Sequence, residues 1–203
     1  MTPLVVATQN PGKLAEMQHH LSEFSWELQF MPAGLEIEET GQTFAENAAL
    51  KACQVAEHTG QWAIADDSGL EVMALKGAPG IYSARYGKTD ADRIQRLLTA
   101  LGDVGNDLRS VGDHRSAQFV CAIALARPDG RLACQAQGVC LGEILMTPQG
   151  EGGFGYDPIF YVPSMQRTFA ELSRETKQRI SHRGEAFKAL RPQLLNLQTE
   201  LGF

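Results

Sequence analysis

The sequence predicts an α/β protein with a mixed β-sheet in two lobes and a cleft between them. Two observations predict this fold class. Apolar runs of strand length alternate with helically spaced apolar residues along residues 1–65, the order typical of an α/β sheet. Two longer apolar segments flank a tight turn in the second half, which indicates an antiparallel hairpin. The length of 203 residues and the hydrophobic content of 43% predict that residues 1–203 form a single domain with one sizeable core.

The first half is expected to form three strands and two helices. The strands are short apolar runs at 4–8, 26–30 and 62–65. The first helix begins at Asn10-Pro11, because asparagine caps helices well and proline suits the first helical position. Its apolar face comprises Leu14, Met17, Leu21 and Phe24. The second helix follows the capping-box pair Thr43 and Glu46, runs to about residue 58 and ends near Gly60.

The second half is expected to be antiparallel. A helix at 90–101 precedes a strand at 118–126, a turn at Pro128-Asp129-Gly130 and a returning strand at 131–141. A glycine-rich loop at 150–155 leads into a short strand at 159–162. The last helix starts at about Ser181, and Pro192 should kink or interrupt it.

Composition and charge exclude several classes of function. The net charge of −6 argues against broad binding to a nucleic-acid backbone. No apolar run approaches the ~20 residues that span a bilayer, and the N-terminus lacks the basic region of a signal peptide. Four cysteines without C-x-x-C spacing indicate free thiols in a reducing compartment rather than a zinc site. We expect a cytoplasmic protein that binds neither nucleic acid nor membrane.

Asp66-Asp67-Ser68-Gly69 is the strongest candidate site. A buried strand is an unfavourable place for two carboxylates unless a cation compensates them. Because hard oxygen ligands suit Mg2+, the strand is predicted to end in a magnesium site, completed by a glutamate of the Glu38-Glu39 loop. The alternatives are a helix N-cap or Asx-turn at the aspartates and a solvated pair at the glutamates.

The segment Thr8-Gln9-Asn10-Pro11-Gly12-Lys13 lies at a predicted strand-to-helix junction. Free backbone N–H groups and the helix dipole make such a junction an anion site. Lys13 opposes the dipole, which a phosphate opposite it would explain. The segment is not a Walker loop, and a simple capped helix explains it about equally well.

Two later motifs carry groups suited to a nucleotide base. The Phe154-Gly155-Tyr156-Asp157 motif offers aromatic faces for stacking and a carboxylate acceptor, and the preceding glycines would let the loop approach a ligand. The donors Lys177, His182 and Arg183 cluster around a predicted helix start, which suits a phosphate or a keto oxygen. The alternatives are a core Phe/Tyr pair and a solvated basic face.

Several other catalytic patterns are missing from the sequence. There is no Nudix-type glutamate helix, no G-x-S-x-G elbow and no cysteine in a catalytic setting. Water is therefore the expected nucleophile. Asp113-His114 has no second histidine nearby and is assigned to a loop.

Taken in order, the motifs resemble the inosine triphosphate pyrophosphatase family, in its bacterial dITP/XTP branch. They are Thr8-x-Asn10-x-x-Lys13, Ala65 to Leu70, Gly77 to Arg85, Gly153 to Pro158 and Ser181 to Gly184, and they cover essentially the whole chain. The resemblance implies an ITPase/Maf-like fold: a homodimer with a long central mixed sheet, flanking helices and an active site in the cleft. It also implies a Mg2+-dependent enzyme that hydrolyses ITP, dITP and XTP to the monophosphate and pyrophosphate, removing them from the nucleotide pool.

The resemblance also assigns roles to the matching residues. Asp67 would be the general base and would hold the metal with Glu38, and residues 8–13 would bind the phosphates. The other nucleotide-binding residues would be Ser68, Phe154, Gly155, Tyr156, Asp157, Lys177, His182 and Arg183.

Base selection and two rival functions follow from the same residues. Hypoxanthine and xanthine present an acceptor at position 6, which suits the donors at 177, 182 and 183, whereas adenine presents an amino group there. The sequence does not show how guanine is rejected. A Maf-like pyrophosphatase acting on other nucleotides is disfavoured by the 154–157 and 182–183 motifs. A nucleotide sensor without turnover is disfavoured by the paired acids at 66–67.

Overall fold

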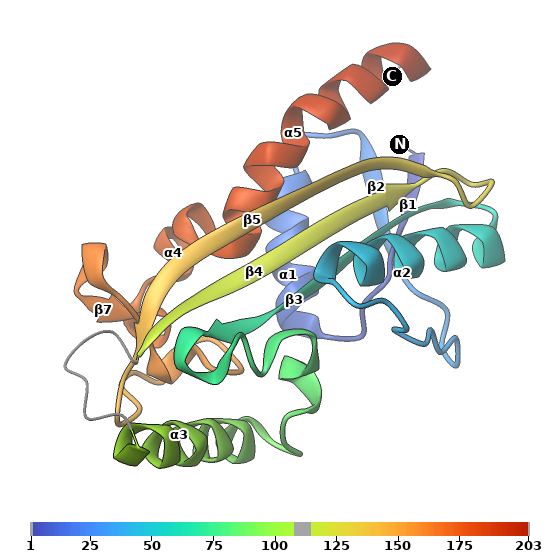
Figure 1. Cartoon of the computed structure of the whole chain (residues 1–203). Helices are drawn as coiled ribbons and strands as arrows, with labels where there is room; N and C mark the ends of the chain where they lie inside the picture. The colour runs from blue at the N-terminus through green and yellow to red at the C-terminus, as the bar shows by residue number, and fades with distance from the viewer. Residues whose placement is uncertain (1, 108–114, 203) are drawn as a thin grey trace. The chain divides into compact units, whose positions relative to one another are not determined.

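The strands form one mixed sheet in the order β2-β1-β3-β4-β5-β6-β7 (Figure 1). This computed structural model describes residues 2–107 and 115–202. β1 pairs in parallel with β2 and β3, while β6 pairs antiparallel with β5 and β7, so the predicted mixed sheet is confirmed. The strands are β1 Thr2–Val6, β2 Trp26–Phe30, β3 Trp62–Val72, β4 Ser116–Ala126, β5 Leu132–Ile144, β6 Phe160–Val162 and β7 Arg167–Thr168.

Helices α1 and α2 begin where their capping residues predict. They are α1 Pro11–Leu21, α2 Phe44–Thr59, α3 Asp90–Asp107, α4 Arg174–Ile180 and α5 His182–Leu201. Asn10 caps α1 by accepting from the Gly12 N–H at 2.8 Å. Thr43 caps α2 by accepting from the Glu46 N–H at 3.1 Å. Half of the capping box is shifted, because the Glu46 carboxylate accepts from the Gln42 N–H instead of the Thr43 N–H.

Three expectations about the elements are wrong. β3 does not end at Ala65, as predicted, but continues to Val72, because neighbouring cations compensate the two carboxylates inside the strand. Helix α4 is absent from the sequence prediction, since its seven residues are mostly polar and carry no helical apolar period. α5 runs past Pro192 without the predicted interruption, because apolar residues on both sides of Pro192 pack into one core; a kink at Pro192 stays a prediction. The Asp113-His114 assignment lies outside the described residues.

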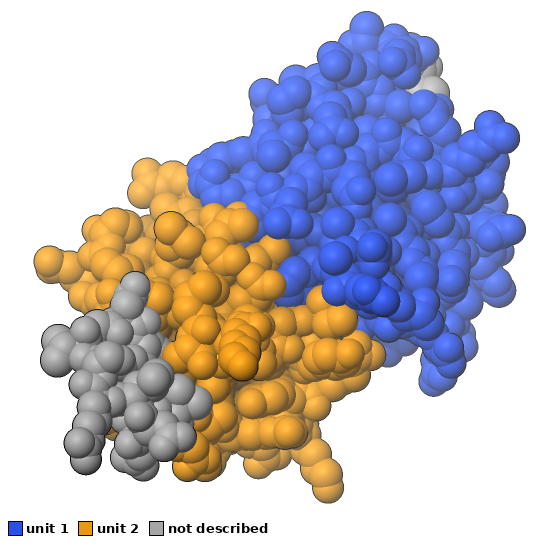
Figure 2. Space-filling model, in the orientation of Figure 1, with its two compact units in different colours: residues 1–67, 121–138, 182–203 blue, residues 68–120, 139–181 orange. Residues whose placement is uncertain are grey.

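The described chain divides into two compact units, which Figure 2 colours separately. Unit 1 comprises residues 1–67, 121–138 and 182–203, and unit 2 comprises residues 68–120 and 139–181. Three of the four boundaries fall inside β3, β4 and β5, and the fourth lies between α4 and α5. The two units agree with the predicted two lobes, and the predicted cleft stays a prediction.

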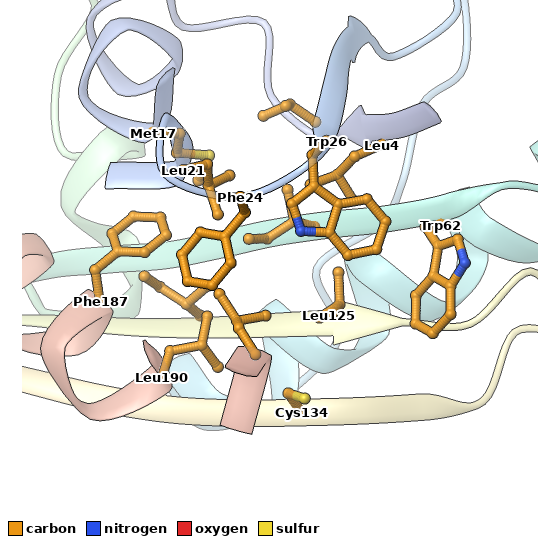
Figure 3. Close-up of a cluster of buried hydrophobic side chains, with 14 of the residues drawn as sticks. Leu4, Met17, Leu21, Phe24, Trp26, Trp62, Leu125, Cys134, Phe187 and Leu190 are labelled. Atoms are coloured by element: carbon orange, nitrogen blue, oxygen red, sulfur yellow. The ribbon is translucent and has the colours of Figure 1, made fainter. Parts of the chain in front are cut away.

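Each unit has its own hydrophobic core. In unit 1, Met17 and Leu21 of α1 and Phe187 and Leu190 of α5 gather with residues of β1 to β5, including Trp26 (Figure 3). In unit 2, the rings of Phe119, Phe160 and Phe169 pack with centroids 4.6–5.8 Å apart. Burying each such side chain stabilises the fold by about 1.5–3 kcal/mol. None of the helices in the described ranges has the length and apolar content needed to cross a membrane.

Candidate active site

Asp66 is held by cations from α1 and α5, all within unit 1. Its Oδ2 lies 3.0 Å from Lys13 Nζ and 2.6 Å from Arg183 Nη2. Arg183 also binds Glu16, which lies almost one turn beyond Lys13 on α1. Burial would raise the pKa of Asp66, but Lys13, Arg183 and Lys51 outweigh it and hold that pKa well below its ordinary value. Asp66 is therefore a charged structural carboxylate rather than a proton acceptor.

Asp67 faces α2, as expected for side chains that alternate along a strand. Its Oδ2 accepts from Asn47 Nδ2 at 3.1 Å, and its Oδ1 lies 3.6 Å from Lys51 Nζ. Burial raises the pKa of Asp67 and Glu39 raises it further, while Lys51, Lys13 and the Asn47 hydrogen bond oppose this only in part. A carboxylate with a raised pKa, 6% exposed, is the member of the pair suited to accept a proton.

Lys51 connects the acidic loop to Asp67. Its Nζ lies 2.7 Å from Glu39 Oε1. Burial would lower the pKa of Lys51, but Asp67, Asp66 and Glu39 outweigh burial and raise it, so the ammonium stays charged. The structure thus brings Glu39 toward Asp67, whereas the predicted metal ligand Glu38 is exposed. Glu38 stays a prediction.

The carboxylates fit a Mg2+ ion that binds together with phosphate. Across residues 2–107 and 115–202, no three His, Cys, Asp or Glu side chains form a group that could hold a metal ion by themselves. Mg2+ usually takes one or two protein carboxylates and completes its coordination with water and substrate phosphates. Asp67 and Glu39 supply two carboxylates that converge on one cation, Lys51, so this position attracts positive charge.

The 8–13 segment has an internal explanation for each of its unusual features. The side chain of Asn10 accepts from the N–H groups of Gly12 and Lys13, and Thr8 Oγ1 accepts from the Asn10 N–H. The Lys13 ammonium, unfavourable at a helix start, has Asp66 as its partner. Gln9, Asn10 and Pro11 are exposed and Gly12 is half-buried, so the segment is accessible to an anion.

Asp157 and Lys177 form a buried ion pair beside Phe154 in unit 2. Lys177 Nζ lies 2.6 Å from Asp157 Oδ2 and 4.6 Å from the centroid of the Phe154 ring. The same Oδ2 accepts from the Phe154 N–H at 2.8 Å. Gly153 is required here: its φ is +77°, and an added Cβ would lie 1.9 Å from Asp157 Oδ2. This glycine therefore serves close packing within its own loop.

Tyr156 and Gly155, the other residues of this motif, make different contacts from Asp157 and Phe154. Tyr156 is 4% exposed and its hydroxyl donates to the Ser83 carbonyl at 3.0 Å, while burial raises its pKa, so Tyr156 is a core residue. The Gly155 N–H donates to Asp90 Oδ2 at 2.7 Å.

Ser68 follows Asp67 on β3 and is half-buried.

His182 and Arg183 open α5 and are both buried in unit 1. Gly138 of β5 fixes this position, because an added Cβ would lie 2.1 Å from the Ala186 nitrogen and 2.3 Å from the His182 carbonyl oxygen. Arg183 is 1% exposed and engaged by Asp66 and Glu16, so it contributes to the ion network of the site. Lys177, predicted with these two, belongs to unit 2.

Sequence reasoning missed Glu16, Asn47 and Lys51. A spacing signal existed: Asn47 and Lys51 are four residues apart on α2, so both lie on one helix face. Glu16 stands three residues after Lys13 on α1 in the same way. A polar pair among apolar helix positions was the available signal, but its partners lie too far away in the sequence to be identified from spacing.

Comparisons with known proteins find relatives over most of the chain. The model of the Ham1 family matches residues 4–193. A dITP/XTP pyrophosphatase of Nostoc sp. is 61% identical over 191 residues, 94% of this chain and 93% of the relative. The same name applies to a relative from Synechocystis sp., 54% identical over 94% of both chains. A HAM1 protein structure from Coxiella burnetii superposes with a TM-score of 0.83 at 47% identity, covering 98% of this chain and 100% of that one.

Proposed function

This chain belongs to the Ham1 family, and from that membership we propose that it hydrolyses ITP, dITP and XTP to the nucleoside monophosphate and pyrophosphate. Relatives named dITP/XTP pyrophosphatase match more than nine-tenths of the chain. The single structural observation that supports the reaction is Asp67, a buried carboxylate with a raised pKa beside a cation. Removing such nucleotides keeps deaminated purines out of the nucleotide pool.

In the proposed mechanism, Asp67 orients the attacking water and accepts its proton. Asp67 and a glutamate of the 38–39 loop would hold Mg2+, and the ion would supply positive charge to neutralise the triphosphate and the transition state. Residues 8–13 bind phosphate through their exposed backbone at the start of α1. Asp66 and Arg183 keep Lys13 in position at that helix start.

The base is bound by the aromatic and cationic residues of the later motifs. Phe154 supplies a stacking face, and Lys177, fixed by Asp157 beside that ring, supplies a donor toward the 6-keto oxygen. His182 and Ser68 complete the nucleotide contacts. Arg183 acts through Asp66, because its guanidinium is buried and engaged within the protein.

We further propose a cytoplasmic homodimer. The four cysteines, Cys53, Cys121, Cys134 and Cys140, are all free, which suits a reducing compartment. Dimerisation rests on family membership alone and is testable by sedimentation or light scattering.

Product analysis tests the proposed reaction. The protein is incubated with Mg2+ and, separately, ITP, XTP, dGTP and ATP, with and without EDTA. We expect monophosphate plus pyrophosphate from ITP and XTP, little product from dGTP or ATP, and no turnover in EDTA until Mg2+ is restored. Diphosphate plus phosphate would overturn the bond assignment, and binding without turnover would support a sensor.

A further inference from the structure

Asn47 is a fully buried amide to which the proposed mechanism gives no role. It lies in the first turn of α2 and is 0% exposed. Its Nδ2 donates to Asp67 Oδ2 at 3.1 Å, and its Oδ1 accepts from the Gly41 N–H at 2.8 Å. Both ends of the amide are therefore bonded, and removing it would take one hydrogen-bond partner from the Asp67 carboxylate and one from the Gly41 N–H.

The same part of α2 also holds the acidic loop. Lys51 binds Glu39, Asn47 accepts from Gly41, and Glu46 Oε2 accepts from the Gln42 N–H at 2.7 Å. The backbone packs so closely that a Cβ on Gly41 would lie 2.7 Å from Asn47 Oδ1. The distance between this loop and Asp67 is thus fixed through the Asn47 side chain.

We propose that Asn47 is a positioning residue that locks the 38–41 loop and Asp67 into one geometry. This inference rests on the proposed function, in which those two elements hold the metal and the water. A neutral amide suits the task, because it orients the Asp67 carboxylate while leaving its charge available to a cation. Lys51 contacts Glu39 and Asp67 as well, but it differs from Asn47 in carrying a positive charge, which a bound metal ion would replace.

Three single variants of the full chain, and the double variant Asn47→Ala/Gly41→Ala, test this role. Asn47→Ala removes both hydrogen bonds, and Gly41→Ala displaces the loop end while keeping the amide. Asn196→Ala is the matched control, since Asn196 is exposed on α5. Each protein is assayed for kcat and KM with ITP, for binding of Mg2+ in the presence of inorganic phosphate by calorimetry, and for hydrogen exchange in a peptide covering residues 38–42. Thermal unfolding measures the folded fraction.

Asn47→Ala is expected to lower kcat and weaken Mg2+ binding by about 10–100-fold, the usual effect of losing a group that orients a metal ligand. KM should change less than about threefold, because the variant disturbs the chemical step rather than substrate binding. Exchange at residues 38–42 should rise. Gly41→Ala should lower kcat similarly, and the double variant should lose less than the product of the two losses, because both disturb one contact. Asn196→Ala should match the wild type.

Three results would overturn the proposal. They are unchanged loop exchange in Asn47→Ala, a kcat and Mg2+ affinity within about twofold of the wild type, or a loss of kcat that merely tracks the folded fraction. If the wild type hydrolyses no nucleotide, the proposed function fails instead. Loop exchange then decides the role of Asn47 without any substrate.

Discussion

At the scale of single residues, Asp66 and Asp67 show how one strand supplies two carboxylates with different properties. Asp66 is neutralised by Lys13 and Arg183, and its pKa is lowered despite burial. Asp67 meets one amide and one more distant lysine, so burial prevails and its pKa is raised. The two pKa values differ because α1 and α5 place two cations beside Asp66, whereas α2 places an amide and a more distant lysine beside Asp67.

The two aspartates should therefore respond in opposite ways to neutralisation. At pH 7, Asp66→Asn should lower the free energy of unfolding by on the order of 3 kcal/mol, because buried cations lose their partner. Asp66 contributes stability above its ordinary pKa of 3.8, and this is lost as pH falls through the lower folded value. The deficit of Asp66→Asn should thus shrink below about pH 4. Urea unfolding at several pH values measures it.

Asp67→Asn is the matched comparison and should not lose stability at pH 7. A raised folded pKa stabilises the protein only below the ordinary value of 3.8, and that stability disappears as pH rises through the folded value. Charged Asp67 is therefore a strained group at neutral pH. A large loss of stability in Asp67→Asn would contradict the environment described for it.

The sequence located the acidic pair, but neither the separate roles of its two members nor their partners. Alternation along a strand implies only that Asp66 and Asp67 need not share a role. The partner of Asp66, Arg183, lies 117 residues away in the chain, and Glu16 and Arg183 are 167 residues apart. Periodicity reports local structure only, so such ion pairs could not be predicted from it.

At the scale of elements, the sequence located helix starts better than strand ends. Asn10 and Thr43 carry side-chain oxygens that cap α1 and α2, and this chemistry is local. The length of β3 depended on cations from other elements, so the sequence misplaced its end. The short α4 is held by the Ser173 cap and by burial of Lys177, neither of which changes the apolar pattern.

The loop carrying Phe154 and Asp157 gives an element-scale prediction. Gly153→Ala and Gly77→Ala both put alanine at positive φ, +77° and +87°, which costs about 1–2 kcal/mol. Only at Gly153 does the added Cβ meet the Asp157 carboxylate; at Gly77 no described atom lies within 4 Å. Gly153→Ala should therefore be the less stable variant in chemical denaturation.

Gly153→Ala should also lose more affinity for ITP than Gly77→Ala does, because the added Cβ displaces Asp157 from Lys177 and from the Phe154 N–H. Equal stability and equal binding in the two variants would show that the loop tolerates a moved Asp157.

At the scale of the whole molecule, alternation of strand and helix was enough to predict the mixed sheet with flanking helices. The partition into two units, with three of its four boundaries inside β3, β4 and β5, follows from long strands that the apolar runs only partly revealed. The order of five motifs along the chain carried the functional prediction, and relatives at 47–61% identity agree with it.

In the proposed reaction, hydrolysis of deaminated purine triphosphates depends on Asp67 more than on any other residue. The most direct test compares wild type and Asp67→Asn for ITP turnover with Mg2+ and for equilibrium ITP binding under the same conditions. We predict that kcat falls by about 10²–10⁴-fold, the usual contribution of a general base, while the nucleotide is still bound. Turnover of Asp67→Asn equal to that of the wild type would contradict the account.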